Sequence, residues 1–192
     1  MKKEIMEWLL SIGLALLIVG LLYAFVIKPY NIKGDSMDPT LKDGERVIVN
    51  KIGKTLGHLD NGNVIVFHAD ETNDYVKRII GKPGDHVVYK NDQLYLNGKK
   101  VDEPYLDYNL KHKTYEQITG SFDSKDLPGS NGQEQIPKDK YLVLGDNREV
   151  SKDSRAFGLI DKDQIVGKVA FRFWPLSEFK INFNPDHTDT QE

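Results

Sequence analysis

The chain has 192 residues, with 26 lysines and arginines, 29 aspartates and glutamates, and a formal net charge of -3. It lacks the basic excess that is typical of nucleic-acid-binding proteins, so no nucleic acid is expected as a partner. The absence of cysteine excludes disulfide scaffolds, cysteine-ligated metals and cysteine nucleophiles. The five histidines show no metal-ligand spacing such as HExxH, so neither a metal nor another cofactor is expected.

The N-terminal part contains an apolar run without charged residues, from Trp8 to Ile27. As a helix this run is about 30 Å long, which matches the hydrocarbon core of one bilayer. It is apolar all round, whereas a buried core helix carries a polar stripe. It is also longer than the apolar region of a cleaved signal peptide, and it ends without a small-x-small cleavage site. We therefore predict one uncleaved transmembrane helix over residues 8–27, preceded by a short N-terminal tail, residues 1–7.

The remainder, residues 28–192, is predicted to be an all-β domain. Short segments rich in β-branched and aromatic residues alternate there with turn signals made of Gly, Pro, Asn and Asp. The expected strands cover residues 46–49, 64–67, 75–80, 86–89, 94–96, 141–144 and 169–173. A loop-like stretch at about 105–140 is expected to form a small inserted subdomain, and residues 187–192 a frayed tail.

The first segment with candidate chemistry is GDSMDPTL, Gly34 to Leu41, which follows the apolar run closely. Gly, Asp, Ser and Pro dominate ordinary turns, so a purely structural turn is one interpretation. The other interpretation is a tight, exposed bend on which the Ser36 hydroxyl reaches a substrate carbonyl.

The second segment is YVKRIIGKPGD, Tyr75 to Asp85. Strand alternation places Tyr75, Lys77 and Ile79 on one face. If that face is buried, desolvation lowers the pKa of Lys77, and a lysine needs a decrease of about 3 units to act as a base near neutral pH. The structural alternative is a lysine whose amine reaches solvent from an ordinary strand.

The third segment is GDNREVSKDSR, Gly145 to Arg155. A polar loop with local hydrogen bonds is its structural interpretation. In an extended chain, however, Ser151, Asp153 and Arg155 share one side, so that the hydroxyl can hold a base while the other two side chains pair. The three segments together supply a serine nucleophile, a lysine base and an orienting shell. A neutral lysine can take the serine proton and return it to the leaving amine.

In order and in residues, these segments resemble the bacterial type I signal peptidases, Ser–Lys proteases that remove signal peptides from secreted preproteins. The similarity includes the N-terminal apolar run, and it covers most of the chain. The single span and the short insertion resemble the Gram-positive branch. Besides the three segments, the similar stretches are residues 46–50, 63–67, 157–160 and 166–168.

The resemblance implies a role for each candidate residue. Ser36 would be the acylating nucleophile and Lys77 the general base. Ser151 would hydrogen-bond the Lys77 amine, and Asp153 with Arg155 would brace the wall of the site. The remaining two candidates, Asp146 and Asn147, would shape the loop.

One position departs from many Gram-negative members, which carry a serine two residues before the nucleophile. This sequence has Gly34 there. The Ser36 backbone N–H remains as one oxyanion donor, but the sequence does not identify the second. Because losing one such donor costs about 2.7–4 kcal/mol of transition-state stabilisation, we expect a backbone N–H or a water to replace it.

The location and partners also follow from the resemblance. Lysines flank both ends of the apolar run, so charge alone does not fix its orientation. Similar enzymes have a cytoplasmic N-terminus and a catalytic domain on the extracytoplasmic side of the cell membrane. The lipid bilayer is therefore one expected partner, and secretory preproteins with Ala-x-Ala-like sites, bound as extended strands, are the substrates. The aromatic run at residues 171–176 either helps to seat the domain on lipid or forms an ordinary core strand.

Three other interpretations remain open from the residues. The self-cleaving domains of repressor proteins are also Ser–Lys peptidases with a Gly-x-Ser-Met element. Those proteins, however, consist of a DNA-binding part and a peptidase part, whereas this sequence begins with an apolar span and shows no helix-turn-helix. A membrane-tethered β module that only binds peptides or cell-wall components would explain the anchor and the strands. An inactive relative of the signal peptidases is the third.

Overall fold

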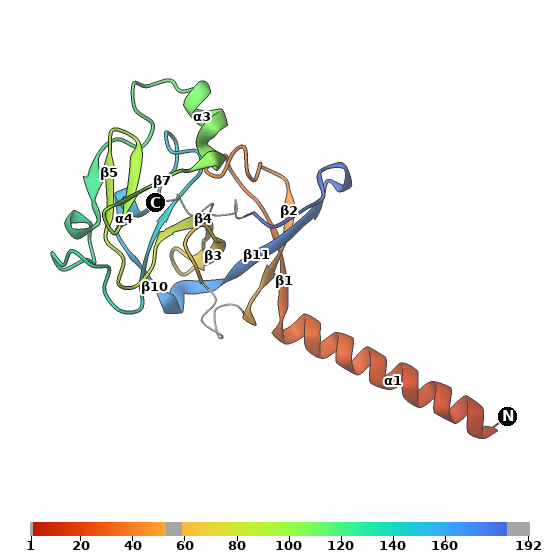
Figure 1. Cartoon of the computed structure of the whole chain (residues 1–192). Coiled ribbons are helices and arrows are strands. Elements are labelled where there is room, and N and C mark those ends of the chain that lie inside the picture. The colour runs from red at the N-terminus through yellow and green to blue at the C-terminus, as the bar shows by residue number, and fades with distance from the viewer. Residues whose placement is uncertain (1, 53–58, 184–192) are drawn as a thin grey trace.

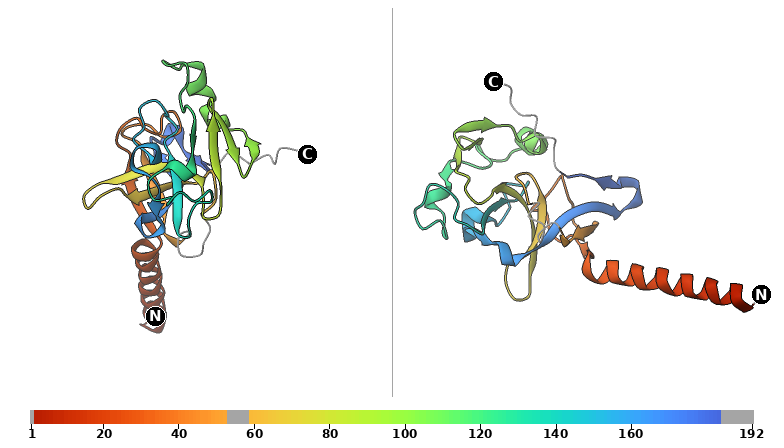
Figure 2. Two further views of the ribbon diagram at one scale, coloured as in Figure 1. Left: turned by 90° about the vertical axis from the view of Figure 1, so that its left-hand side faces the viewer. Right: turned by 60° about the horizontal axis from the view of Figure 1, so that its bottom comes forward.

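The structure is a computed structural model that describes residues 2–52 and 59–183. The expected frayed tail, residues 187–192, lies outside the described residues. Helix α1, Lys2–Phe25, projects from the β domain and leads into strand β1, Ile27–Asn31 (Figures 1 and 2). The predicted helix boundary at Ile27 was wrong, because Ile27 pairs with Asn50 of strand β2, Arg46–Asn50.

The apolar side chains that the structure describes in α1, up to Val19, lie on the helix surface, away from the domain core. Those described as exposed extend from Ile5 to Val19, and Trp8 is 72% exposed. Within the described part of the chain, no helix is both long enough and apolar enough to cross a membrane.

The domain is built on a curled antiparallel sheet with the strand order β1-β2-β11-β3-β4-β9-β10, and β12 pairs with β11. The longest strand, β11, pairs with β2 along one part and with β3 along another, and register shifts interrupt both pairings. Such bulges bend a strand, and they let the sheet curl. The remaining strands of this sheet are β3 Val64–His68, β4 Asp74–Gly81, β9 Lys140–Leu144, β10 Ile160–Asp161, β11 Ile165–Trp174 and β12 Lys180–Ile181.

A second, smaller sheet has the order β7-β6-β5-β8. Its strands are β5 Val87–Lys90, β6 Gln93–Leu96, β7 Lys99–Val101 and β8 Phe122–Asp123. The hairpin between β6 and β7 turns at Asn97-Gly98, where both residues have positive φ, as a two-residue type I′ turn requires. This sheet begins well before the segment 105–140 that was expected to form the insertion.

Each strand expected from the sequence is confirmed, and the domain is mostly β. The additional strands are β1, β7, β8, β10 and β12, most of them too short to show a period. The helices that the structure describes after α1 have at most five residues, which agrees with the lack of a sustained helical pattern. They are η1 Pro104–Leu106, α3 Asp107–Lys111, η2 Ser124–Asp126, α4 Ser154–Phe157, η3 Lys162–Gln164 and η4 Leu176–Glu178.

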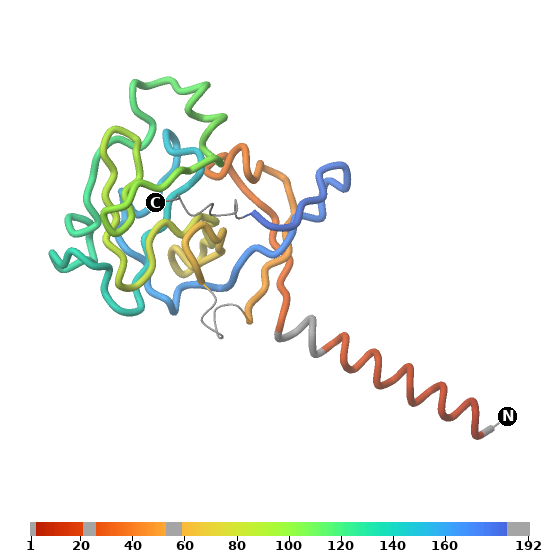
Figure 3. The backbone as a smooth tube through the Cα atoms, viewed as in Figure 1, coloured from red at the N-terminus to blue at the C-terminus, as the bar shows by residue number. Residues whose placement is uncertain are grey.

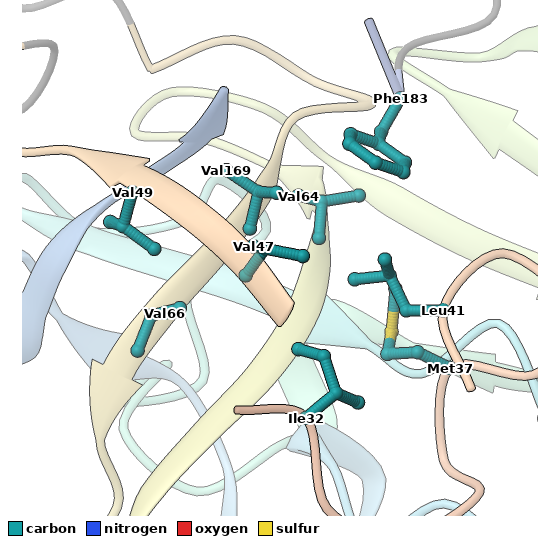
Figure 4. Close-up of a cluster of buried hydrophobic side chains, with 9 residues drawn as sticks. All are labelled: Ile32, Met37, Leu41, Val47, Val49, Val64, Val66, Val169 and Phe183. Atoms are coloured by element: carbon teal, nitrogen blue, oxygen red, sulfur yellow. The ribbon is translucent and has the colours of Figure 1, made fainter. Parts of the chain in front are cut away.

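One hydrophobic cluster fixes the turn that follows β1. Met37 and Leu41 from this turn are fully buried, and they pack with Ile32 against valines of the curled sheet (Figure 4). Each buried side chain of this size stabilises the folded state by about 1.5–3 kcal/mol. Ser36, directly before Met37, therefore lies on a bend that is anchored on both sides. The other members of the cluster are Val47, Val49, Val64, Val66, Val169 and Phe183.

Candidate active site

The structure brings Ser36 and Lys77 together from distant parts of the chain. Ser36 lies on the turn after β1, and Lys77 lies in the middle of β4. The Lys77 Nζ atom is 2.8 Å from the Ser36 Oγ atom, within hydrogen-bond distance. A second bond from Nζ, 3.0 Å long, goes to the Val76 carbonyl oxygen. The two atoms that a serine–lysine reaction needs are thus in contact.

Lys77 is buried, with only 3% of its surface exposed. Burial removes water from the amine and lowers the pKa of Lys77 from 10.5 to about 8, although the charges of Asp153 and Asp146 act in the opposite direction. The amine does not extend into solvent, so the interpretation of Lys77 as an ordinary surface lysine was wrong. A substantial fraction of this side chain is neutral near pH 8.

Ser151 is close to the dyad but does not make the expected hydrogen bond. Its Oγ atom is buried and has no hydrogen-bond partner among the described residues. The Lys77 amine is directed instead at Ser36 and at the Val76 carbonyl. The prediction of a Ser151–Lys77 bond is therefore not met in this conformation.

Gly145 allows the loop of residues 145–153, called the catalytic loop below, to pack directly on the backbone of Ser36. A Cβ atom built at Gly145 would lie 2.4 Å from the Ser36 carbonyl oxygen and 2.2 Å from Ser151 Oγ. Neither approach leaves room for a side chain. Next to it, the Asn147 N–H donates to the same Ser36 carbonyl over 3.0 Å. The loop at 145–147 thus holds the backbone of the nucleophile.

Asp153 and Arg155 form the expected pair. The Nε and Nη2 atoms of Arg155 donate to the two carboxylate oxygens of Asp153, each over 2.9 Å. Asp153 also accepts from the Gly145 N–H over 3.1 Å, and it caps α4 by accepting from the Arg155 N–H. This carboxylate therefore fixes both ends of the loop that carries Ser151.

Asp146 has a structural partner that the sequence analysis did not assign, Arg78. The Nε and Nη2 atoms of Arg78 donate to the two oxygens of Asp146 over 2.8 and 2.6 Å, and both side chains are 0% exposed. Arg78 also donates to the carbonyls of Gly62 and Phe183, each over 2.7 Å. The Thr40 hydroxyl donates to Asp146 over 2.5 Å. Strand alternation placed Arg78 opposite Lys77, but no local pattern indicated its partner.

A groove of about 1020 Å³ passes over the dyad. Its walls are the segment from Tyr30 to Asp38 and the segment from Glu71 to Lys77, with Asn147 and Val150 near the loop. In the described sheet, β1 is an edge strand, and β9 pairs with β4 only from Arg78 onward. The groove is therefore bordered by strand edges whose outer backbone groups are not taken up by a neighbouring strand. The described residues contain no cluster of three or more potential metal ligands.

Comparison with known proteins identifies the family. Residues 5–174 match the family model described as signal peptidase, peptidase S26. Signal peptidase IB of Staphylococcus aureus strain MRSA252 is 68% identical over 189 residues, 98% of this chain and 99% of the relative. Signal peptidase I of Bacillus caldolyticus is 46% identical over 169 residues, 88% of this chain and 91% of the relative. The crystal structure of a signal peptidase I from Enterococcus faecalis V583 superimposes with a TM-score of 0.52 at 33% identity, covering 57% of this chain and 94% of that one.

The chain therefore belongs to the signal peptidase family, peptidase S26. Within this family it is a type I enzyme of the Gram-positive branch, a serine protease that cleaves signal peptides. Membership removes two of the alternatives, the repressor-type peptidase and the tethered module that only binds.

Proposed function

We propose that the chain is a membrane-anchored Ser–Lys endopeptidase that cleaves secretory preproteins after small-x-small sites. The observation that carries the proposal is the 2.8 Å contact between Ser36 Oγ and the buried Lys77 Nζ. A serine hydroxyl is a weak nucleophile until an adjacent base takes its proton. Among the described residues, no histidine bonds to Ser36 Oγ, and the base in contact with it is the desolvated amine of Lys77.

In the proposed reaction, neutral Lys77 accepts the Ser36 proton while Oγ attacks the carbonyl carbon of the scissile peptide bond. The Ser36 backbone N–H stabilises the negative oxygen of the tetrahedral intermediate. The protonated amine then gives its proton to the departing amine nitrogen, and the signal peptide remains as an ester on Ser36. Lys77 next takes a proton from a water, whose oxygen attacks the ester carbonyl. The protonated amine returns this proton to the departing Ser36 Oγ, which releases the signal peptide as a free carboxylic acid and restores neutral Lys77.

Ser151 contributes to this cycle through its unpaired hydroxyl. When Lys77 is protonated, the amine has three donors and needs acceptors besides Ser36 and the Val76 carbonyl. A rotation of the Ser151 side chain toward Nζ supplies one and also pairs a buried oxygen. Asp153 and Arg155 hold this loop in place, while Asp146 and Asn147 shape it around the Ser36 carbonyl.

The substrate is proposed to bind in the groove as one extended strand. The outer edges of β1 and of the first half of β4 supply backbone donors and acceptors for strand addition. Ile32, Met37 and Val76 line the groove near the dyad, and an apolar wall suits small apolar side chains before the scissile bond. The preference for Ala-x-Ala-like sites rests on the resemblance to the family.

Anchoring in the bilayer is proposed for α1. The support is the charge-free run from Trp8 to Ile27, the exposed apolar side chains of α1, and the projection of this helix away from the domain (Figure 1). The N-terminus is proposed to be cytoplasmic, with the β domain on the extracytoplasmic side of the cell membrane. The side chains of Trp174, at the end of β11, and of Leu176 and Phe179, just after it, are also exposed. These residues favour contact with lipid over a buried core strand.

The test is cleavage of a radiolabelled preprotein with an Ala-x-Ala site by the detergent-purified full chain, beside Ser36→Ala. We expect cleavage at that site by the wild type and none by the variant. Cleavage that survives Ser36→Ala would exclude the Ser–Lys mechanism. No cleavage of several preproteins by the folded wild type would favour an inactive relative. Extraction of membranes with alkaline carbonate tests the anchor, and release of the full chain into the soluble fraction would contradict it.

A further inference from the structure

The segment between β7 and β8, residues 103–119, contacts every part of the chain that carries the site. We propose that this segment, called the brace below, positions the Ser36–Lys77 dyad. The positioning residues are Glu103 and Asn109, and the proposal rests on the proposed Ser36–Lys77 chemistry. The brace connects two strands of the smaller sheet, β7 and β8. None of the described residues that line the groove belongs to the brace. Its action on catalysis is therefore indirect.

The buried end of the brace is centred on one carboxylate oxygen, Glu103 Oε1. It accepts hydrogen bonds from Arg148 Nη2 over 2.5 Å, from Tyr89 Oη over 2.7 Å and from Tyr105 Oη over 2.6 Å. Arg148 is 0% exposed and Glu103 6% exposed in their side chains. A buried guanidinium requires such a partner, because an unpaired charge in the interior is strongly unfavourable. Glu103 thus determines where Arg148 lies.

Arg148 transmits this position to the catalytic loop. Its Nε atom donates to the Gly145 carbonyl over 3.0 Å, and Thr119 of the brace accepts from Nη1 over 2.9 Å. Gly145 is the residue whose Cα approaches the Ser36 carbonyl so closely that no side chain fits. A displacement of Arg148 therefore moves the loop that holds the nucleophile.

The brace also contacts the strand that carries the base. The Tyr105 ring lies 4.0 Å from the guanidinium carbon of Arg78, which follows Lys77 in β4. Arg78 in turn forms the buried pair with Asp146. Through Tyr105 and Glu103, one short stretch therefore contacts both arginines. Arg78 follows Lys77 in β4, and Arg148 bonds to Gly145 in the loop that packs on Ser36.

The surface end of the brace is formed by α3 and the loop after it. The Asn109 side-chain amide donates to the Asp38 carbonyl over 3.0 Å and to the Asp146 carbonyl over 2.9 Å, which joins the turn after Ser36 to the catalytic loop. Glu149 accepts from the backbone N–H groups of Thr114 and Tyr115 over 2.8 and 2.9 Å. Figure 3 shows this end of the brace, in green, beside the loop that follows β1, in orange.

These contacts predict an effect on the chemical step and little effect on substrate binding. The brace does not line the groove, so KM is expected to change less than twofold. A misplacement of about 1 Å between reacting groups lowers the rate about a hundredfold. Loss of the Asn109 contacts alone is expected to lower kcat about tenfold, since the buried end remains, and loss of the Glu103 charge about a hundredfold.

The sharpest variant is Asn109→Asp, compared with Asn109→Ala and with Lys111→Ala as a control. Aspartate has the shape of asparagine but no donor, so its carboxylate would face two carbonyl oxygens. We expect kcat for preprotein cleavage by the full chain to fall at least as much in Asn109→Asp as in Asn109→Ala. Lys111 is exposed on the same helix, and its replacement is expected to leave kcat unchanged. A loss of kcat in Asn109→Asp that is at least as large as in Asn109→Ala indicates that Asn109 acts as a hydrogen-bond donor, because a purely steric role would tolerate aspartate.

Glu103→Gln and Tyr105→Phe test the buried end in the same assay, with thermal unfolding measured in parallel. A fall in kcat at constant KM in folded protein supports the brace. An unchanged kcat in folded Asn109→Ala and Asn109→Asp overturns it, as does a change confined to KM. If Glu103→Gln does not fold, the two Asn109 variants decide. Cleavage by the wild type in the same experiment separates this result from a failure of the proposed function.

Discussion

Two adjacent basic residues of β4, Lys77 and Arg78, occupy opposite sides of the same strand in different electrostatic environments. Both are buried, with 3% and 0% exposure. Arg78 meets the Asp146 carboxylate through two hydrogen bonds and remains charged. Lys77 is in contact with a hydroxyl and a carbonyl, and no ion pair joins it to a carboxylate in the described part of the chain. Burial lowers the pKa of Lys77 to about 8.

The difference shows that burial alone does not determine the role of a cation. A carboxylate in contact compensates for desolvation and makes the charge a structural element. Where the carboxylates are near but not in contact, desolvation dominates, and the amine becomes able to exchange a proton at moderate pH. One strand thus carries a fixed charge on one side and a proposed base on the other.

The largest expected effect on cleavage comes from replacing Lys77 with arginine, the residue type of its neighbour Arg78. Lys77→Arg should abolish cleavage, because a guanidinium does not lose its proton at any usable pH. The measurement is single-turnover cleavage of a preprotein by the folded variant between pH 7 and 10. Measurable turnover that depends on Ser36 would remove Lys77 from the role of base.

The second change removes the charge of Asp146, the partner of Arg78. Asp146→Asn should lower the free energy of unfolding by about 3–5 kcal/mol, because it leaves a buried guanidinium without a counter-charge. The variant should also lower the pKa of Lys77 further, since the Asp146 charge raises it. Urea unfolding of the full chain in detergent, followed by tryptophan fluorescence, tests the first effect. A loss below 1 kcal/mol would show that the pair contributes little.

Removing the amine should stabilise the fold while it abolishes activity. Lys77→Met is expected to raise the free energy of unfolding by about 3 kcal/mol at pH 7, because the pKa of Lys77 falls from 10.5 to about 8 on folding and each unit corresponds to about 1.4 kcal/mol. The cost of burying the charge is fully present below pH 8. It decreases as pH rises from about 8 to 10.5 and is absent above that range. A gain of equal size at pH 7 and pH 11 would contradict this origin.

The smallest expected effect is that of Ser151→Ala. The variant should fold normally and lose about tenfold in kcat, since one hydrogen bond to a charged amine contributes about 1.5–3 kcal/mol at most. If Ser151 holds the protonated amine, its removal lowers the pKa of Lys77, and the acidic limb of the pH–rate profile moves to lower pH. An unchanged profile would count against contact between the two side chains in the reaction.

Local sequence patterns predicted the elements that carry the chemistry. Alternation in β4 indicated that Lys77 shares a face with Tyr75 and Ile79, and the turn composition of residues 34–41 indicated a bend at Ser36. Two-residue strands such as β10 left no period to detect. The partners of Arg78 and Arg148 were also beyond prediction, because Asp146 is 68 residues from Arg78 and Glu103 is 45 residues from Arg148 in the sequence. Contacts of this kind depend on the tertiary arrangement alone.

The unpaired edges along the groove also bear on when cleavage can occur. In the proposed strand addition, the free edges of β1 and β4 bind a chain whose own N–H and C=O groups are unpaired. A folded segment does not offer such free groups. The proposal therefore requires that the cleavage region of a preprotein is presented before it folds, so that the order of processing and folding follows from the unpaired edges of a single groove.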